Sequence, residues 1–177
     1  TVLWARDGKE ICEHVIAVAR QHGVRKVTKS KSMLSEEAQL NVALLAAGIQ
    51  PVETDLGEYI LQINNNEPPS HIVAPVVHKS KDEVSDLFAR VHQRPRLTDI
   101  PQMTREAREF LRPHFLSSDM GVSGGNFLIA ETGSVAVFTN EGNEGMCTVL
   151  PKVHVVVTGI EKVLPTLDDL AAVARLL

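Results

Sequence analysis

The glycine-rich stretch at residues 121–145 reads GVSGGNFLIAETGSVAVFTNEGNEG. Two apolar runs within it, 127–130 and 135–138, have the composition of short β-strands. Each run is bounded by polar turns that contain glycine, a residue that adopts positive φ angles and lets other groups approach the backbone closely. The pattern predicts a β-hairpin within the fold.

The two outer turns of this hairpin are expected to lie at the same end, so that their donors and acceptors converge into a pocket. The candidate residues for ligand binding in these turns are Ser123, Gly124, Gly125, Asn126, Asn140, Glu141 and Asn143. The middle turn contributes Glu131, Thr132 and Gly133. The alternative is that all three are tight turns with Asn and Gly in their usual positions. Three such turns in one short stretch favour the pocket.

Composition excludes several classes of protein. The 177 residues are 44% hydrophobic, which is enough for a proper core. A net charge of -4 and 4% aromatic residues give no support to nucleic-acid binding. No apolar run reaches the roughly 20 residues that span a bilayer, and no signal peptide opens the sequence, so we expect a cytoplasmic protein without a membrane span.

Metal-binding patterns are also absent from the sequence. The two cysteines, Cys12 and Cys147, are far apart in apolar contexts and are expected to be buried thiols. The seven histidines show no zinc-binding spacing. We therefore expect neither a metal site nor a cofactor in this chain.

The rest of the chain alternates apolar strand-like runs with helical patterns. Capping residues predict helices that begin near Asp7, Ser35, Ser80 and Thr166, and a further helix is expected over 101–115, interrupted near Pro113. Strands are expected at 2–5, 24–28, 49–54, 59–63, 70–77 and 153–158. This alternation predicts a three-layer α/β fold with a Rossmann-like parallel or mixed sheet. No Gly-x-Gly-x-x-Gly follows a strand, so a dinucleotide site is not expected.

In open sheets of this kind, ligands bind beyond the carboxyl ends of the strands. Lys29, Ser30, Lys31 and Ser32 follow one strand and precede a helix, an arrangement that suits a phosphate or carboxylate. The alternative is a solvated basic turn.

A second strand end carries three carboxylates within six residues: Glu53, Asp55 and Glu58. Crowded carboxylates repel one another, so one of them is expected to have a raised pKa and to act as a general acid or base, unless nearby lysines suppress the shift. The alternative is an exposed acidic turn. Glu53 and Glu131, which directly follows an apolar strand, are the candidate catalytic residues.

Four segments resemble the LUD domain of the lactate utilisation protein B family: 27–33 (VTKSKSM), 53–59 (ETDLGEY), 69–79 (PSHIVAPVVHK) and 126–143, which contains IAETG and TNEGN. They occur in the family's order and cover essentially the whole chain. The resemblance implies one LUD domain over 1–177 and a fold similar to the sugar-phosphate isomerase and coenzyme A transferase group. It also implies a component of an L-lactate oxidation system that works beside other lactate-utilisation subunits.

Proteins of that family carry a C-terminal ferredoxin-like segment whose cysteines hold two 4Fe-4S clusters. Such clusters need several thiolate ligands, and this chain has two separated cysteines. We therefore expect the clusters in the full-length protein and not in this domain.

Two functions remain open from the sequence. In the first, the domain handles the substrate of a redox enzyme: the Lys29–Ser32 turn holds a small carboxylate or phosphate-bearing ligand while Glu131 or Glu53 manages a proton. In the second, the domain docks partner subunits and does no chemistry.

Overall fold

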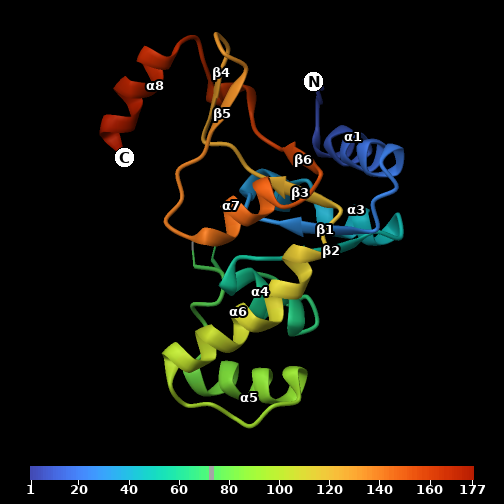
Figure 1. Cartoon of the computed structure of the whole chain (residues 1–177), viewed down its shortest axis with the longest axis vertical. Coiled ribbons are helices and arrows are strands. Elements are labelled where there is room, and N and C mark those ends of the chain that lie inside the picture. Colours follow the sequence, from blue (N-terminus) through green and yellow to red (C-terminus); the bar gives the residue numbers. More distant parts are fainter. Residues whose placement is uncertain (72–73) are drawn as a thin grey trace.

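A parallel β-sheet forms the centre of the computed structural model, which describes residues 1–71 and 74–177 (Figure 1). Its strand order is β2-β1-β3-β6. The strands are β1 (Lys26–Lys29), β2 (Gln50–Glu53), β3 (Met120–Ser123) and β6 (Val153–Val156), and every neighbouring pair is parallel. Their carboxyl ends therefore lie at one edge of the sheet.

Helices flank this sheet and create two hydrophobic cores. One core joins β1 and β3 to α1 (Gly8–Gln21), α2 (Met33–Glu37) and α3 (Leu40–Ala46). The other joins Val52 of β2 to α4 (Leu56–Ile63), α5 (Lys81–His92), α6 (Ile100–Leu116) and α7 (Gly142–Val149). The expected α/β class, with a mostly parallel sheet covered by helices, is confirmed.

Local capping chemistry fixes most helix starts where the sequence predicted them. The side chain of Asp7 accepts a hydrogen bond from the backbone N–H of Glu10 at 2.9 Å, and Ser80 forms a full capping box with Glu83. Ser35 is an exception, because Ser32 caps α2 and Gln39, at φ 54°, separates α2 from α3. Pro113 lies inside α6 without ending it.

Three of the expected strands are wrong or lack support. Residues 2–5 have no regular structure. Residues 59–63 belong to helix α4, because the Asp55 carboxylate accepts from the N–H groups of Gly57 and Glu58 and starts a helix there. Residues 70–71 and 74–77 form bends and turns, and the remainder of that expected strand, 72–73, lies outside the described residues.

The expected hairpin is confirmed, but it lies outside the central sheet. Strands β4 (Phe127–Ile129) and β5 (Ser134–Ala136) pair antiparallel, and β7 (Val163–Leu164) pairs with β4 to complete a second sheet of order β5-β4-β7. The short 3-10 turn η1 (Ile160–Lys162) precedes β7, and α8 (Leu167–Val173) and η2 (Ala174–Leu176) follow it. Figure 1 shows this sheet and α8 projecting from the central sheet.

Gly121 in β3 allows α7 to approach the sheet, and we predict that it cannot be replaced. A Cβ atom at this position would lie 1.8 Å from the backbone carbonyl oxygen of Cys147. Gly121→Ala should therefore destabilise the protein by at least about 1–3 kcal/mol, the usual cost of overpacking. Thermal unfolding followed by circular dichroism measures this loss.

The matched control is Gly145→Ala, because Gly145 lies within α7 and a Cβ there has no atom within 4 Å. Alanine favours a helix interior over glycine by about 0.5–1 kcal/mol, so this variant should be as stable as the parent or slightly more so. Equal melting temperatures for the two variants would contradict the close packing of α7 on β3.

Candidate functional site

A cavity of about 390 Å³ opens at the carboxyl ends of β1 and β2. Side chains of α2, α3, α4 and the loop after α4 line it, together with Glu53 at the end of β2. This position agrees with the general rule that open α/β sheets bind ligands beyond their strand ends. The first two strand-end segments predicted from the sequence contribute to the cavity through Lys31, Glu53 and Glu58.

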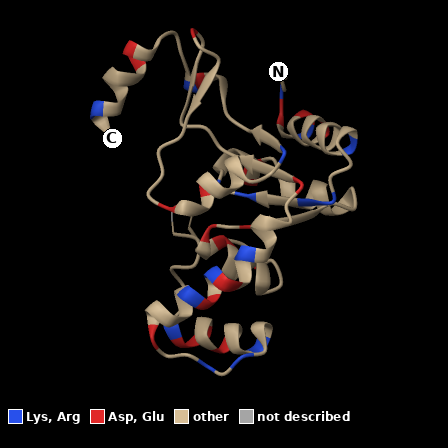
Figure 2. Ribbon diagram, viewed as in Figure 1, with Lys and Arg blue, Asp and Glu red and all other residues tan. Residues whose placement is uncertain are grey.

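A second cavity of about 350 Å³ lies near the start of α6 and is lined by Arg94 and Glu109, among others. These two side chains already form an ion pair, at 2.6 Å. Figure 2 shows acidic and basic segments interspersed along α5 and α6, without a band of one sign. The cavity at the strand ends is the better candidate, since residues that line it have buried polar atoms without a partner among the described residues.

Strand register brings Lys29 and Glu53 together. They are directly paired residues of the parallel strands β1 and β2, so their side chains emerge side by side on the same face of the sheet. The Lys29 ammonium lies 3.0 Å from Oε1 of Glu53, and both side chains are buried. A buried charge pair of this kind depends on both partners being present.

Two neighbouring helices complete the surroundings of this ion pair. From α2, the Lys29 ammonium also contacts the hydroxyl of Ser35, at 3.1 Å, and forms an ion pair with Glu36. From α3, the amide of Asn41 donates to Oε1 of Glu53 at 2.5 Å. The Lys29 ammonium is therefore bound by side chains of α2 and β2.

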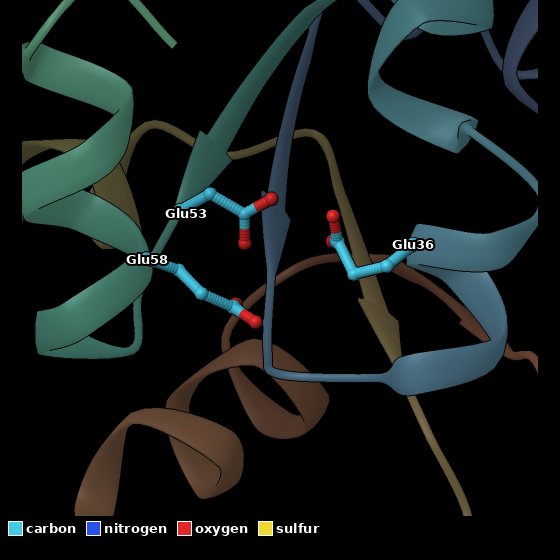
Figure 3. A group of neighbouring side chains, drawn as sticks. All are labelled: Glu36, Glu53 and Glu58. Atoms are coloured by element: carbon cyan, nitrogen blue, oxygen red, sulfur yellow. The ribbon is translucent and has the colours of Figure 1, made fainter. Parts of the chain in front are cut away.

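Three carboxylates converge here from different elements: Glu36 of α2, Glu53 of β2 and Glu58 of α4 (Figure 3). One oxygen from each lies within 4.8 Å of the others. Carboxylates this close repel one another unless a positive charge or a proton lies between them. The Lys29 ammonium supplies one positive charge to this group.

Several buried polar atoms at this cavity lack a hydrogen-bond partner among the described residues. They are Oε2 of Glu53, Oε2 of Glu58 and Oδ1 of Asn41, all from residues that line the cavity. Glu53 is only 3% exposed. An unpaired buried polar group costs about 1–3 kcal/mol, so atoms of this kind point to a missing partner such as a ligand, a water molecule or a proton.

The pKa values of Glu58 and Lys29 show the electrostatic coupling in this site. Burial, followed by the charge of Glu53, raises the pKa of Glu58 to about 9, although Lys29 opposes the shift. Burial lowers the pKa of Lys29, but Glu53 and Glu36 outweigh that effect and the net shift is upward. At neutral pH the site therefore contains a protonated Glu58 and a charged Lys29.

The loop after α4 forms one wall of the cavity through Glu67, Pro68, Pro69 and Pro75. Glu67 holds this loop in place: its carboxylate pairs with Lys79 at 2.7 Å and with His78 at 2.7 Å. Hydrogen bonds from these two side chains lower the pKa of Glu67 to about 2. Glu67 is thus ionised and already paired.

Part of the glycine-rich stretch lies next to the Lys29–Ser32 turn. The backbone N–H of Ser30 bonds to the carbonyl of Val122, and a Cβ at Gly124 would lie 3.5 Å from the side chain of Ser32. Ser123 pairs with His154 at 2.8 Å. The Glu144 carboxyl approaches the buried Ser30 hydroxyl without a well-formed hydrogen bond.

The remaining predicted site residues do not converge. Glu131 accepts a hydrogen bond from the backbone N–H of Leu167 and so supports the start of α8, at the far end of the hairpin from the strand ends. Thr132 and Gly133 belong to the same exposed turn. Asn126 accepts from the N–H of Phe138 within the hairpin.

Three further predicted residues lie at the start of α7. Asn140 is exposed in the loop that precedes it, and Glu141 is the residue before its first turn. The amide of Asn143 donates to the hydroxyl of Thr54 at 3.4 Å, directly after the end of β2, but neither residue lines the cavity. Gly125 packs against Val135 and Val156 instead.

Glu36, Ser35 and Asn41 are site residues that sequence reasoning missed. Glu36 and Asn41 belong to none of the motifs that the sequence analysis singled out, and Ser35 was predicted only as the start of a helix. A signal was present, since Lys29 and Glu53 each end an apolar strand and buried charges require partners from whichever helix covers them.

Comparisons with known proteins agree on one family. The model of the LUD domain matches residues 1–177. Lactate utilization protein B of Geobacillus kaustophilus (strain HTA426) is 44% identical over 176 residues, which cover 99% of this chain and 37% of that protein. Lactate utilization protein B of Shouchella clausii (strain KSM-K16) is 43% identical with the same coverage.

The chain thus spans about 37% of the length of these curated relatives. No solved structure matches it significantly. Among residues 1–71 and 74–177, no helix combines the length and the apolar character that crossing a membrane requires.

Proposed function

Because the chain belongs to the LUD domain family, we propose that it is the ligand-handling domain of a lactate utilisation protein. The observation that carries this proposal is the set of unpartnered buried atoms of Glu53, Glu58 and Asn41, which all line one cavity. A site built only for stability would pair such atoms, because each unpaired one costs free energy. A ligand with hydrogen-bonding groups would supply the missing partners.

The ligand that fits this cavity is a small hydroxy acid such as L-lactate. Glu53 Oε2 would accept a hydrogen bond from the ligand's hydroxyl group, as an ionised carboxylate only accepts. A protonated Glu58 and the ammonium of Lys31, which also lines the cavity, are the groups that would receive the ligand's carboxylate. Lys29 is assigned to positioning Glu53, since its ammonium already contacts Glu36 and Glu53.

The assembly role remains the second candidate, and exposed apolar side chains favour it. Val149 at the end of α7, Ile160 in η1 and Leu176 in η2 are 79%, 71% and 86% exposed. Exposed apolar groups of this kind are common at surfaces that bind other proteins, although single ones are also found on monomers. In this alternative the domain docks other lactate-utilisation subunits and the cavity is incidental.

The family's iron–sulfur clusters do not fit the residues of this chain. Cys12 and Cys147 are both buried: Cys12 contacts the carbonyl of Ala38 in one core, and Cys147 contacts Thr54 in the other. A 4Fe-4S cluster needs several thiolates around one centre. We propose that the two clusters expected in the full-length protein are bound elsewhere, in a cytoplasmic complex with partner subunits.

The relation of this fold to the sugar-phosphate isomerase and coenzyme A transferase group is likewise a proposal. It is supported by the parallel order β2-β1-β3-β6 and by the cavity at the carboxyl ends of these strands.

Glu53→Gln in the full-length protein is the decisive test of the proposed function. The change is nearly isosteric but removes the charge that would accept the hydroxyl hydrogen bond, so L-lactate oxidation should fall by roughly 100-fold or more. Growth on L-lactate as sole carbon source and lactate oxidation in extracts are the measurements. Growth on glucose should not change, and lactate oxidation is compared per amount of folded protein, because the variant leaves the buried Lys29 with Glu36 as its remaining charged partner.

Glu109→Gln is the matched control, because Glu109 is an exposed residue of α6 that pairs with Arg94 and does not line the cavity at the strand ends. This variant should grow on lactate like the parent. Normal lactate oxidation by Glu53→Gln, at normal protein level, would favour the assembly role, which substitutions of Val149 and Ile160 would then disrupt.

A further inference from the structure

We propose that Glu53 and Glu58 form a carboxyl pair that holds a single proton, with Lys29 as the positioning residue that keeps the negative charge on Glu53. The inference rests on the proposed function, since it specifies how the same cavity operates. It makes the site an acid–base centre in which a neutral acid and an ionised base face one ligand.

The geometry of the two carboxyl groups is the first support. One carboxyl oxygen of Glu53 lies within 4.8 Å of one of Glu58, although a carboxylate has no hydrogen to donate to its neighbour. Each group has one buried oxygen without a partner among the described residues, Oε2 in both cases. A single proton on one of the two groups removes the repulsion between two like charges and turns that group into a donor, while the other group still needs a donor from a ligand.

The distribution of donors decides which residue carries that proton. Oε1 of Glu53 receives hydrogen bonds from Lys29, at 3.0 Å, and from Asn41, at 2.5 Å. These donors satisfy that oxygen of Glu53, whereas the described residues supply no donor to Oε2 of Glu58. The proton therefore resides on Glu58.

The other charged groups around Glu58 leave this assignment unchanged. Glu36 of α2 and Glu53 of β2 disfavour a negative charge on Glu58, and Lys29 of β1 favours one. Lys31, Glu37 and Glu67 are the other charged residues that line this cavity. Negative groups outnumber positive ones, so an additional charge on Glu58 would be costly.

Such a pair is suited to proton exchange with a ligand. Two carboxyl groups whose environments separate their protonation states divide the roles of acid and base between them. When Glu53 takes a proton from a ligand hydroxyl, Glu58 can release its own proton to solvent, so the pair again holds one proton and keeps its total charge.

The pair can be tested without any ligand by following the carboxyl carbons of glutamate, labelled with carbon-13, by NMR as pH is varied. The unmodified chain should show one glutamate that titrates near pH 9. The signal should vanish in Glu58→Gln. In Glu53→Gln it should move down by at least one pH unit, because the neighbouring charge has gone while the burial remains.

Glu37→Gln is the control, since Glu37 lines the cavity without belonging to the pair, and it should leave the high-pH signal in place. Titration of every glutamate in the ordinary acidic range in the unmodified chain would overturn the proposal, as would a high-pH signal that is indifferent to Glu53→Gln. Because no lactate is present, these results are independent of the growth test. If the titration shows no shared proton, Glu53 can still be a ligand-binding residue. If Glu53→Gln grows normally on lactate, the titration can still show the shared proton.

Discussion

Lys29→Met is expected to lower the free energy of unfolding by about 3–5 kcal/mol, the usual cost of removing one partner from a buried ion pair. The Lys29 side chain is fully buried, and its ammonium contacts Glu53, Glu36 and Ser35. Methionine fills a similar volume but leaves the Glu53 carboxylate buried without its cation. For a domain of this size each kcal/mol corresponds to about 2–4 °C, so the melting temperature should fall by roughly 10 °C.

Lys26→Met is the matched control on the same strand. Lys26 starts β1, and its ammonium makes one exposed hydrogen bond, to Ser117 at 2.9 Å, so its loss should cost no more than about 0.5 kcal/mol. Combining Lys29→Met with Glu53→Gln should recover part of the loss, because the unpaired charge is then removed as well. A Lys29→Met protein as stable as Lys26→Met would contradict the role given to the buried ammonium.

The parts of the fold that could be predicted from sequence are those that local chemistry determines. Asp7, Ser80 and Thr166 each place an acceptor at the first free N–H groups of a helix, and each begins a helix in the structure. The hairpin expected from the apolar runs at 127–130 and 135–138 forms, with pairing over 127–129 and 134–136, because a short glycine-containing turn joins the two strands. Each of these predictions depends only on residues that are close together in the sequence.

Strand β3 could not be predicted, although it lies in the middle of the central sheet. Its residues, Met120–Ser123, include a glycine and a serine and do not read as a strand. They become one because β1 and β6 supply hydrogen bonds on either side, and because α7 requires the absence of a side chain at Gly121. At 59–63 a strand was predicted where the structure has none. The run is apolar like a strand, but the cap at Asp55 starts a helix there.

Only part of the candidate site could be predicted, because local sequence patterns mark some of its residues and not others. Lys29 and Glu53 stand at strand ends, where the sequence alone locates ligand sites, and their pairing follows once β1 and β2 are known to be parallel neighbours. Glu36 and Asn41 depend on how α2 and α3 cross the sheet, which no local pattern specifies. Glu131 also follows a strand, but that strand belongs to the separate sheet β5-β4-β7, so its position at a strand end does not bring it to the cavity.

The second large effect that we expect is a loss of stability with rising pH that depends on Glu58. Its pKa is 4.5 in the unfolded chain and about 9 in the folded protein, where burial and Glu53 disfavour the charge. Between these values the folded state holds a proton that the unfolded state has released. The stabilising contribution is therefore complete below the unfolded pKa and declines as pH rises toward the folded one, by at most about 1.4 kcal/mol per pH unit.

Glu58→Gln removes this dependence, because glutamine is neutral at every pH while it keeps the shape of the protonated side chain. The gap in unfolding free energy between the unmodified chain and Glu58→Gln should therefore shift in favour of the variant as pH rises, by roughly 2–4 kcal/mol between about pH 5 and about pH 8. Urea denaturation at several pH values measures it, with Glu109→Gln as a control whose curve should run parallel to that of the parent. A constant gap between the parent and Glu58→Gln across this range would mean that Glu58 is as readily ionised in the folded chain as in the unfolded one, and that the cavity is open enough to solvate Glu36, Glu53 and Glu58 together.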